Sequence, residues 1–198
     1  MSALIPNACV RYMSQTSFSN GQLACGSIAY HWALACVHHL CKPAPSQSKM
    51  SELMEHAIGV HMKIVGITGH SMLMLSDLLQ HLGMPRKTVC REIFIMGDST
   101  CGSEGSEPIE KDAAVELEDC VICHFSHLPT CMKKESALVF TANQHTTALF
   151  LDESGRLFCF DSLSGVVMQK ALEDMKSVLD GFHHLHYPFE ACAFLISC

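Results

Sequence analysis

The first half of the chain places apolar residues at helical spacing. From Cys25 to Cys41 the sequence contains no proline, and its apolar positions cover nearly every face of a helix. This pattern predicts a buried, central helix that ends at Lys42-Pro43, because proline cannot continue a helix. Ser51 to about Met62 and Thr68 to Leu82 predict two further helices, the second closed by Gly83.

The second half carries short apolar runs separated by turn residues. Residues 1–20 predict a loop, and residues 98–113, rich in Gly, Ser and acidic side chains, predict an exposed connection. Asp152-Glu153-Ser154-Gly155 predicts a hairpin turn, and Ser164 to Asp180 predicts a helix. The predicted strands are Glu92–Met96, Ala114–Phe125, Ala137–Thr141, Thr146–Leu151, Leu157–Phe160 and Ala191–Ile196. We therefore predict an α+β fold, with a helical N-terminal half packed on a mostly antiparallel sheet.

The composition limits the classes of partner and the cellular compartment that we expect for this protein. With 198 residues and no visible repeat or linker, the sequence predicts one domain over residues 1–198. The net charge of −7, with 13 Lys and Arg that form no basic cluster, disfavours nucleic acid and anionic membranes as partners. Met1 to Tyr12 lacks a secretion signal, and no apolar run approaches the roughly 18 residues that span a bilayer. We expect a cytoplasmic, reducing location in which the 12 cysteines are mostly thiols.

Cys25 stands where a loop enters the predicted central helix. Unpaired backbone N–H groups and the positive end of the helix dipole stabilise a thiolate at such a position. The same N–H groups can bind the oxyanion that forms when a carbonyl is attacked. Gly21 and Gly26, on either side, would let a substrate backbone approach closely. Cysteine is most often a packing residue, but this position makes Cys25 a candidate nucleophile.

His145 and Asp161 supply a candidate base and a carboxylate to orient it. His145 lies seven residues before Asp152, and Asp161 lies five residues after Arg156, on either side of the predicted turn. In an antiparallel hairpin both residues therefore fall at the open end, within reach of each other across the strands. This spacing predicts an imidazole–carboxylate hydrogen bond, and such a pair would complete a catalytic triad with Cys25.

These residues and their order resemble those of papain-like cysteine peptidases. His145 lies 120 residues after Cys25, compared with about 130–150 in the papain pattern. Asn20-Gly21-Gln22-Leu23-Ala24-Cys25 is similar to the cysteine box of ubiquitin-specific proteases. The resemblance implies that Cys25 is the nucleophile, His145 the base and Asp161 its orienter. It also implies that Asn20 or Gln22 donates a side-chain hydrogen bond to the oxyanion.

The chain also resembles enzymes that act on ubiquitin and its relatives. His145 and Phe160-Asp161-Ser162 resemble the His/Asp element of Josephin-type enzymes and small-modifier proteases. The short β-rich end resembles the deubiquitinase domain of herpesvirus tegument proteins, although those enzymes place the histidine in Asp-Pro-His, where this chain has Asp161-Ser162-Leu163. The resemblance implies a papain-like fold, no cofactor, and cleavage of peptide or isopeptide bonds after the tail of ubiquitin or a ubiquitin-like modifier.

Two non-enzymatic hypotheses stay open. One is a zinc-binding interaction module, because four residues have the spacing of a tetrahedral zinc site: Cys120, Cys123, His124 and Cys131. However, the apolar pair between the first two cysteines continues a strand pattern, whose alternation would put those cysteines on opposite faces and favours packing. The run His183-His184-Leu185-His186 also suggests metal, but we expect it to be an exposed loop. The second hypothesis is a catalytically inactive papain-like adaptor that binds a partner through the same cleft.

Overall fold

A computed structural model describes residues 8–70, 73, 75–82, 87–97, 115–117, 120–186 and 189–198. Its helices are α1 (Cys25–Val37), α2 (Gln47–Thr68), α3 (Leu75–Leu82), α4 (Leu128–Cys131) and α5 (Met175–His183), with single 3₁₀ turns η1 (Gln15–Ser17), η2 (Phe125–His127) and η3 (Leu172–Asp174). Its strands are β1 (Cys9–Arg11), β2 (Val89–Met96), β3 (Val115–Leu117), β4 (Cys120–His124), β5 (Ser136–Ala142), β6 (His145–Leu151), β7 (Leu157–Asp161), β8 (Val166–Lys170) and β9 (Glu190–Ser197).

Within the described residues these strands form one sheet, in the order β1-β8-β7-β6-β5-β9-β2-β4-β3. All neighbouring pairs are antiparallel except β2 and β4, which run parallel. The predicted turn at Asp152 joins β6 to β7, where the Asp152 carboxylate accepts hydrogen bonds from the backbone N–H groups of Ser154 and Arg156. The predicted α+β class with a mostly antiparallel sheet is therefore confirmed.

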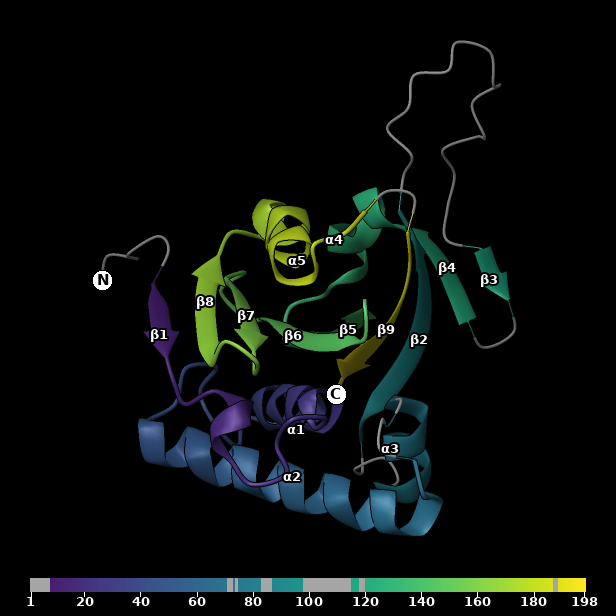
Figure 1. Ribbon diagram of the computed structural model, residues 1–198. Coiled ribbons are helices and arrows are strands. Elements are labelled where there is room, and N and C mark those ends of the chain that lie inside the picture. Colours follow the sequence, from purple (N-terminus) through teal and green to yellow (C-terminus); the bar gives the residue numbers. More distant parts are fainter. Residues whose placement is uncertain are drawn as a thin grey trace, which may run out of the picture.

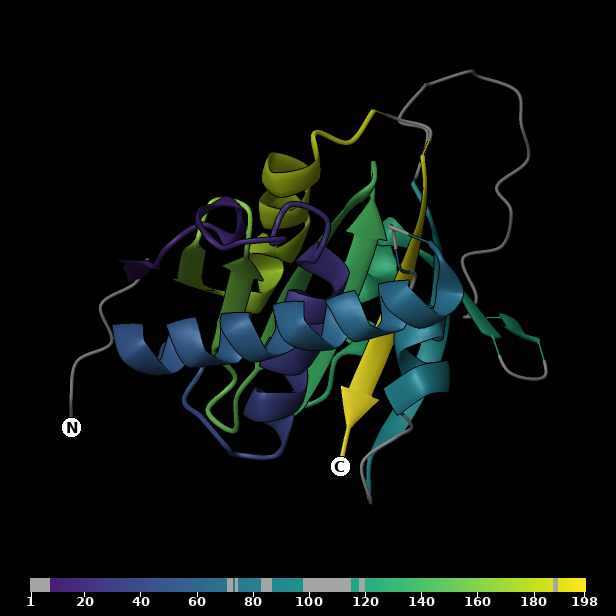
Figure 2. The same cartoon turned by 60° about the horizontal axis from the view of Figure 1, so that its bottom comes forward.

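Helices cover both faces of this sheet (Figure 1). Helix α1 packs on β5 and β6, and α2 lies across the outer side of α1 (Figure 2). The core on this side includes Trp32, whose ring centroid lies 5.3 Å from that of Phe160. A second core, with Phe125, Phe140 and Leu179 buried, fills the opposite face under α4 and α5. Burial on both faces explains why β5 and β6 read as nearly continuous apolar runs.

The N-terminal helices differ from the prediction mainly at their ends. Helix α1 begins at Cys25 as predicted but ends at Val37, because His39 adopts a left-handed φ of 54° before the proline is reached. Helix α2 is longer than expected, from its N-cap Ser46 to Gly69, which closes it at a φ of 73°. The predicted helix from Thr68 to Leu82 is therefore wrong at the described residues 69, 70 and 73, which are not helical, and α3 forms its second half.

The predicted helix from Ser164 to Asp180 is also wrong over its first half. Gly165, at a φ of 65°, turns the chain back along β7, and the residues that follow form strand β8. β8 pairs with β7 on one side and β1 on the other, where the sequence had predicted only an N-terminal loop. Pairing with the strands on both sides, together with the strand preference of the β-branched Val166 and Val167, thus outweighs the helical pattern of these residues. The predicted helical pattern corresponds to a helix in α5.

Two further predictions concern the connection before β4. The single strand predicted over Ala114–Phe125 contains two described strands, β3 and β4, which pair antiparallel. The connection predicted over residues 98–113 lies outside the described residues.

Among the helices that the structure does describe, none is both long and apolar enough to cross a membrane.

Candidate active site

Cys25 occupies the first position of α1. Its N-cap residue is Ala24, which provides no side-chain acceptor, so the N–H groups of the first turn remain available to an oxyanion. A tight loop precedes the helix, in which Ala24 N–H donates to Gly21 O at 3.2 Å. Gly21 is required by this loop itself, since a Cβ there would collide with the carbonyl oxygen of Gln15. Gly26 differs from Gly21, because a Cβ there would make only an ordinary van der Waals contact, 3.5 Å from Leu73 O.

His145 is placed by the turn between β5 and β6. Asn143 and Gln144 have φ values of 49° and 61°, as a two-residue type I′ hairpin turn requires, and His145 follows directly as the first residue of β6. On the other side of β6, the β7 register pairs Ala148 with Phe160 and so sets Asp161 diagonally across from His145. The hairpin geometry predicted from the sequence is present.

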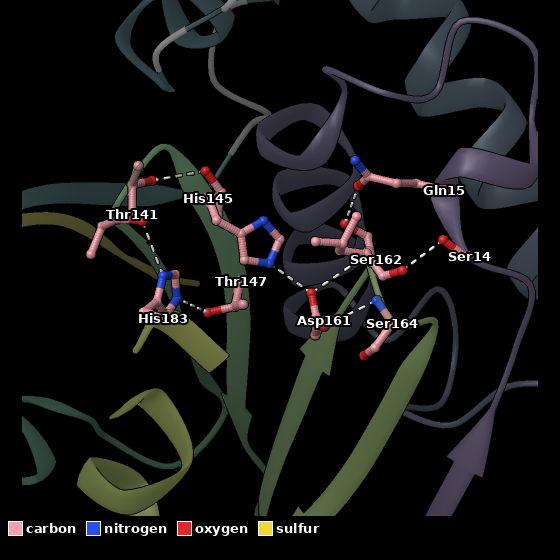
Figure 3. Close-up of polar contacts among 12 residues, drawn as sticks. Ser14, Gln15, Thr141, His145, Thr147, Asp161, Ser162, Ser164 and His183 are labelled. Atoms are coloured by element: carbon pink, nitrogen blue, oxygen red, sulfur yellow. Dashed lines mark hydrogen bonds and ion pairs between the residues drawn. The ribbon is translucent and has the colours of Figure 1, made fainter. Parts of the chain in front are cut away.

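The His145 ring and the Asp161 carboxylate form a hydrogen-bonded pair, with Nε2 and Oδ1 2.7 Å apart (Figure 3). The carboxylate is fixed from its other side by the backbone N–H groups of Leu163 and Ser164, at 3.1 and 3.0 Å. Burial raises the pKa of Asp161, but the hydrogen bonds from His145 and Ser164 outweigh it and hold this pKa below its ordinary value. Asp161 is therefore an ionised, immobile acceptor for the imidazole.

The other side of the His145 ring hydrogen-bonds the Cys25 thiol, and Nδ1 is the nitrogen left for this contact. Burial opposes the charge on Cys25, but the hydrogen bond and charge of His145, together with hydrogen bonds from Thr146, lower the pKa of the thiol. Burial likewise opposes the charge on His145, yet Asp161 and Cys25 raise its pKa to about 9. The lowered pKa of the thiol and the raised pKa of the imidazole both favour the thiolate–imidazolium form of this pair.

His183 is a neighbour of the site that sequence reasoning missed. We expected an exposed loop here, but His183 is 3% exposed, and its ring centroid lies 5.4 Å from that of His145 (Figure 3). Its Nδ1–H donates to the Ala142 carbonyl at 3.1 Å, and its Nε2 accepts from the Thr147 hydroxyl at 2.9 Å. These contacts fix a neutral tautomer, and burial lowers the pKa of His183 to about 4. The signal available in the sequence was its position at the end of an amphipathic helix.

Gln15 is a second residue that the sequence did not reveal. Its side chain is buried, accepts a hydrogen bond from the Ser162 hydroxyl at 2.6 Å and donates to Gln22 O at 3.1 Å. Ser162 follows Asp161, and Gln22 lies three residues before Cys25. Gln15 thus links the loop that precedes Cys25 to the turn that follows Asp161.

A hollow of about 360 Å³ opens beside the thiol. Its walls are mostly apolar, and the lining residues include Cys25, Leu73, Phe94, Gln144, Thr146, Glu190 and Phe194. Asn20 and Gln22, the two residues implied as oxyanion donors, instead line a neighbouring hollow between the loop and α2. Leu23 contributes to both hollows, so the two lie side by side. The oxyanion role of Asn20 and Gln22 stays a prediction.

The candidate zinc residues lie apart from this site, on β4 and α4. Cys123 and Cys131 have their Sγ atoms 3.4 Å apart, while the side chain of Cys120 lies outside the described part of the chain. His124 is exposed at the end of β4. Among the side chains that are described, no group of three or more His, Cys, Asp or Glu could hold a metal ion.

A thiol at the start of a central helix, packed on an antiparallel sheet that presents an imidazole–carboxylate pair, is the arrangement that the sequence predicted. No family model and no curated protein matches the sequence. Among solved structures, the chain is similar to the ubiquitin-specific protease encoded by murine cytomegalovirus tegument protein M48, solved in complex with a ubiquitin-based suicide substrate. The TM-score is 0.63 at 13% identity, over 96% of this chain and 85% of that one. The two proteins therefore share a fold.

Proposed function

We propose that this protein is a cysteine peptidase of the deubiquitinase type, which cleaves peptide or isopeptide bonds after the C-terminal tail of ubiquitin or a ubiquitin-like protein. The observation that carries this proposal is the contact chain from Cys25 through His145 to Asp161, closed by the 2.7 Å bond between the last two. Cys25, at the N-terminal end of α1, also lines the apolar hollow.

In the proposed reaction the Cys25 thiolate attacks the scissile carbonyl, and the carbonyl electron pair moves to oxygen. The N–H groups of the first turn of α1 stabilise the resulting oxyanion. His145 gives its Nδ1 proton to the leaving amine as the C–N bond breaks, which yields an acyl-enzyme. Water, deprotonated by His145, then releases the carboxylate and regenerates the thiolate. Asp161 holds the ring oriented through both steps.

The substrate assignment rests on two supports. M48, with which this chain shares its fold, was solved with a ubiquitin-based suicide substrate. In addition, Gly26 lines the hollow beside Cys25 without a side chain, which suits a narrow acyl segment such as the Gly-Gly end of a ubiquitin tail. We accordingly assign ubiquitin or a relative as the partner.

The test is covalent labelling of the folded protein with ubiquitin that carries an electrophile in place of its C-terminal carboxylate. We expect one adduct, mapped to Cys25 by mass spectrometry. Cys25→Ala should abolish it, and His145→Ala should slow it strongly, because the thiol loses its hydrogen-bond donor.

Cys9→Ala serves as the matched control, since Cys9 is an exposed thiol on β1 outside the site, and this variant should label like the unmodified protein. Tight ubiquitin binding without an adduct would contradict the peptidase proposal and favour the hypothesis of a catalytically inactive adaptor. Labelling that persists in Cys25→Ala would move the nucleophile elsewhere.

A further inference from the structure

Two cysteines outside the candidate active site lie thiol to thiol. Cys123 stands in β4, Cys131 ends α4, and their Sγ atoms are 3.4 Å apart. Cys123 is only 3% exposed, whereas Cys131 is partly exposed. A reagent from solvent therefore meets Cys131 first, with a second thiol in contact behind it.

The segment between the two cysteines is anchored in the core. Phe125 and Leu128, within it, are fully buried, and the Phe125 ring packs on Phe140 with centroids 6.2 Å apart. Cys123 itself is held in the sheet, paired in parallel register with Ile95 of β2. Both thiols are thus held in place by the fold, and little conformational entropy remains to be lost when they join.

The geometry of the pair also suits stepwise oxidation. Cys131 is its partly exposed member, and its Sγ contacts that of the buried Cys123. A partly exposed thiol beside a resolving thiol is the arrangement found at peroxide-sensitive cysteine pairs.

We propose that Cys123 and Cys131 form a dithiol modification site that hydroperoxides oxidise to a disulfide. The Cys131 thiolate attacks one peroxide oxygen, the O–O bond breaks, and the departing hydroxide takes up a proton to give water. The resulting Cys131 sulfenic acid is then attacked by the Cys123 sulfur, the S–O bond breaks, and a second water leaves with the Cys123 proton. Two thiols and one hydrogen peroxide thereby give one disulfide and two waters. This site does not depend on the peptidase activity proposed above.

The test is alkylation mapping of the full chain with Cys25→Ala, which removes the thiol of the candidate active site. The protein is exposed to hydrogen peroxide in slight excess, blocked with N-ethylmaleimide and digested with trypsin. Residues 112–133 form one tryptic peptide, which holds three cysteines: Cys120, Cys123 and Cys131. After oxidation, the mass of this peptide should show the loss of two hydrogen atoms and the addition of a single maleimide, on Cys120. Reduction with dithiothreitol before alkylation should restore three alkylated cysteines.

Two further variants locate the bond. Cys120→Ser should keep the disulfide, and Cys131→Ser should lose it, each checked for folding by circular dichroism. Three alkylated cysteines after oxidation, or a disulfide that survives Cys131→Ser, would overturn the proposal. So would zinc bound one to one in the purified protein and lost in Cys131→Ser, which would establish the metal site instead. The buried Cys36 and its hydrogen-bonded neighbour Cys41 give an internal comparison in the same digest, and faster oxidation there would also count against the assignment.

Discussion

His145 and His183 lie with their ring centroids 5.4 Å apart, and their pKa values move in opposite directions. Burial disfavours the charge on both rings. At His145 the hydrogen bonds to Asp161 and Cys25 overcome that effect and raise the pKa to about 9. At His183 burial prevails and lowers the pKa to about 4, although the bond to Ala142 raises it. Near neutral pH the positive charge of this pair therefore resides on His145, which the proposed chemistry requires to be protonated.

Because His183 is neutral in the folded state, its titration should destabilise the protein in acid. The unfolded chain takes up a proton near pH 6.5, whereas the folded protein does so only near 4, so stability falls as the pH drops through this window. The full loss is up to about 3 kcal/mol. Urea unfolding measured from pH 7 to pH 4 should show the wild-type protein losing stability relative to His183→Gln, whose amide can keep both hydrogen bonds. A constant difference between the two proteins would contradict the assignment.

Removal of His145 should leave Cys25 less reactive than an ordinary thiol. In His145→Ala the charge and hydrogen bond that lower the pKa of Cys25 are lost, while the burial that raises it remains. At pH 7 each unit of rise reduces the thiolate about tenfold. Iodoacetamide alkylation of Cys25 against pH should therefore shift to higher pH in the variant. The unmodified protein should retain its ion pair up to about pH 9, where His145 loses its proton. Identical profiles would show that the two side chains are not coupled.

The loop before Cys25 should tolerate no side chain at Gly21. A Cβ there would collide with Gln15 O, and the displaced Gln15 would leave the Ser162 hydroxyl and the Gln22 carbonyl without their partner. We expect Gly21→Ala to cost about 1–3 kcal/mol and to suppress Cys25 labelling. Gly59→Ala is the control, because nothing lies within 4 Å of a Cβ at this position in α2. It should gain up to about 1 kcal/mol in urea unfolding. Equal stability of the two variants would remove this role of Gly21.

The predicted oxyanion donors can be tested separately. Loss of a side-chain donor to the oxyanion costs about 10²–10³-fold in kcat. Asn20→Ala and Gln22→Ala are measured in turn on a fluorogenic ubiquitin substrate. The variant that lacks the side chain that donates to the oxyanion should show this loss of kcat, with little change in KM. If neither variant slows turnover, the backbone N–H groups of α1 suffice, or a residue of the Cys25 hollow such as Gln144 donates instead.

The pairing of His145 with Asp161 was accessible from the sequence because it is a local property. A hairpin turn at Asp152 and the two-residue period of strands fix which positions of β6 and β7 meet, so counting from the turn is sufficient. The start of α1 was accessible for a similar reason. Loop residues followed by an unbroken apolar run indicate where a helix begins, and this placed Cys25 at its first position.

Only the tertiary structure decided which distant segments complete the site. Three features of the site depend on how the helices pack on the sheet: the contact of Cys25 with His145, the contact of the His145 and His183 rings, and the hydrogen bonds by which Gln15 links two loops. No periodicity within one segment encodes such contacts. The same holds for residues 166–170, where partners on both sides impose a strand. The sequence alone thus determined a thiol at a helix start and an imidazole–carboxylate hairpin. Packing over long separations brought them into one site.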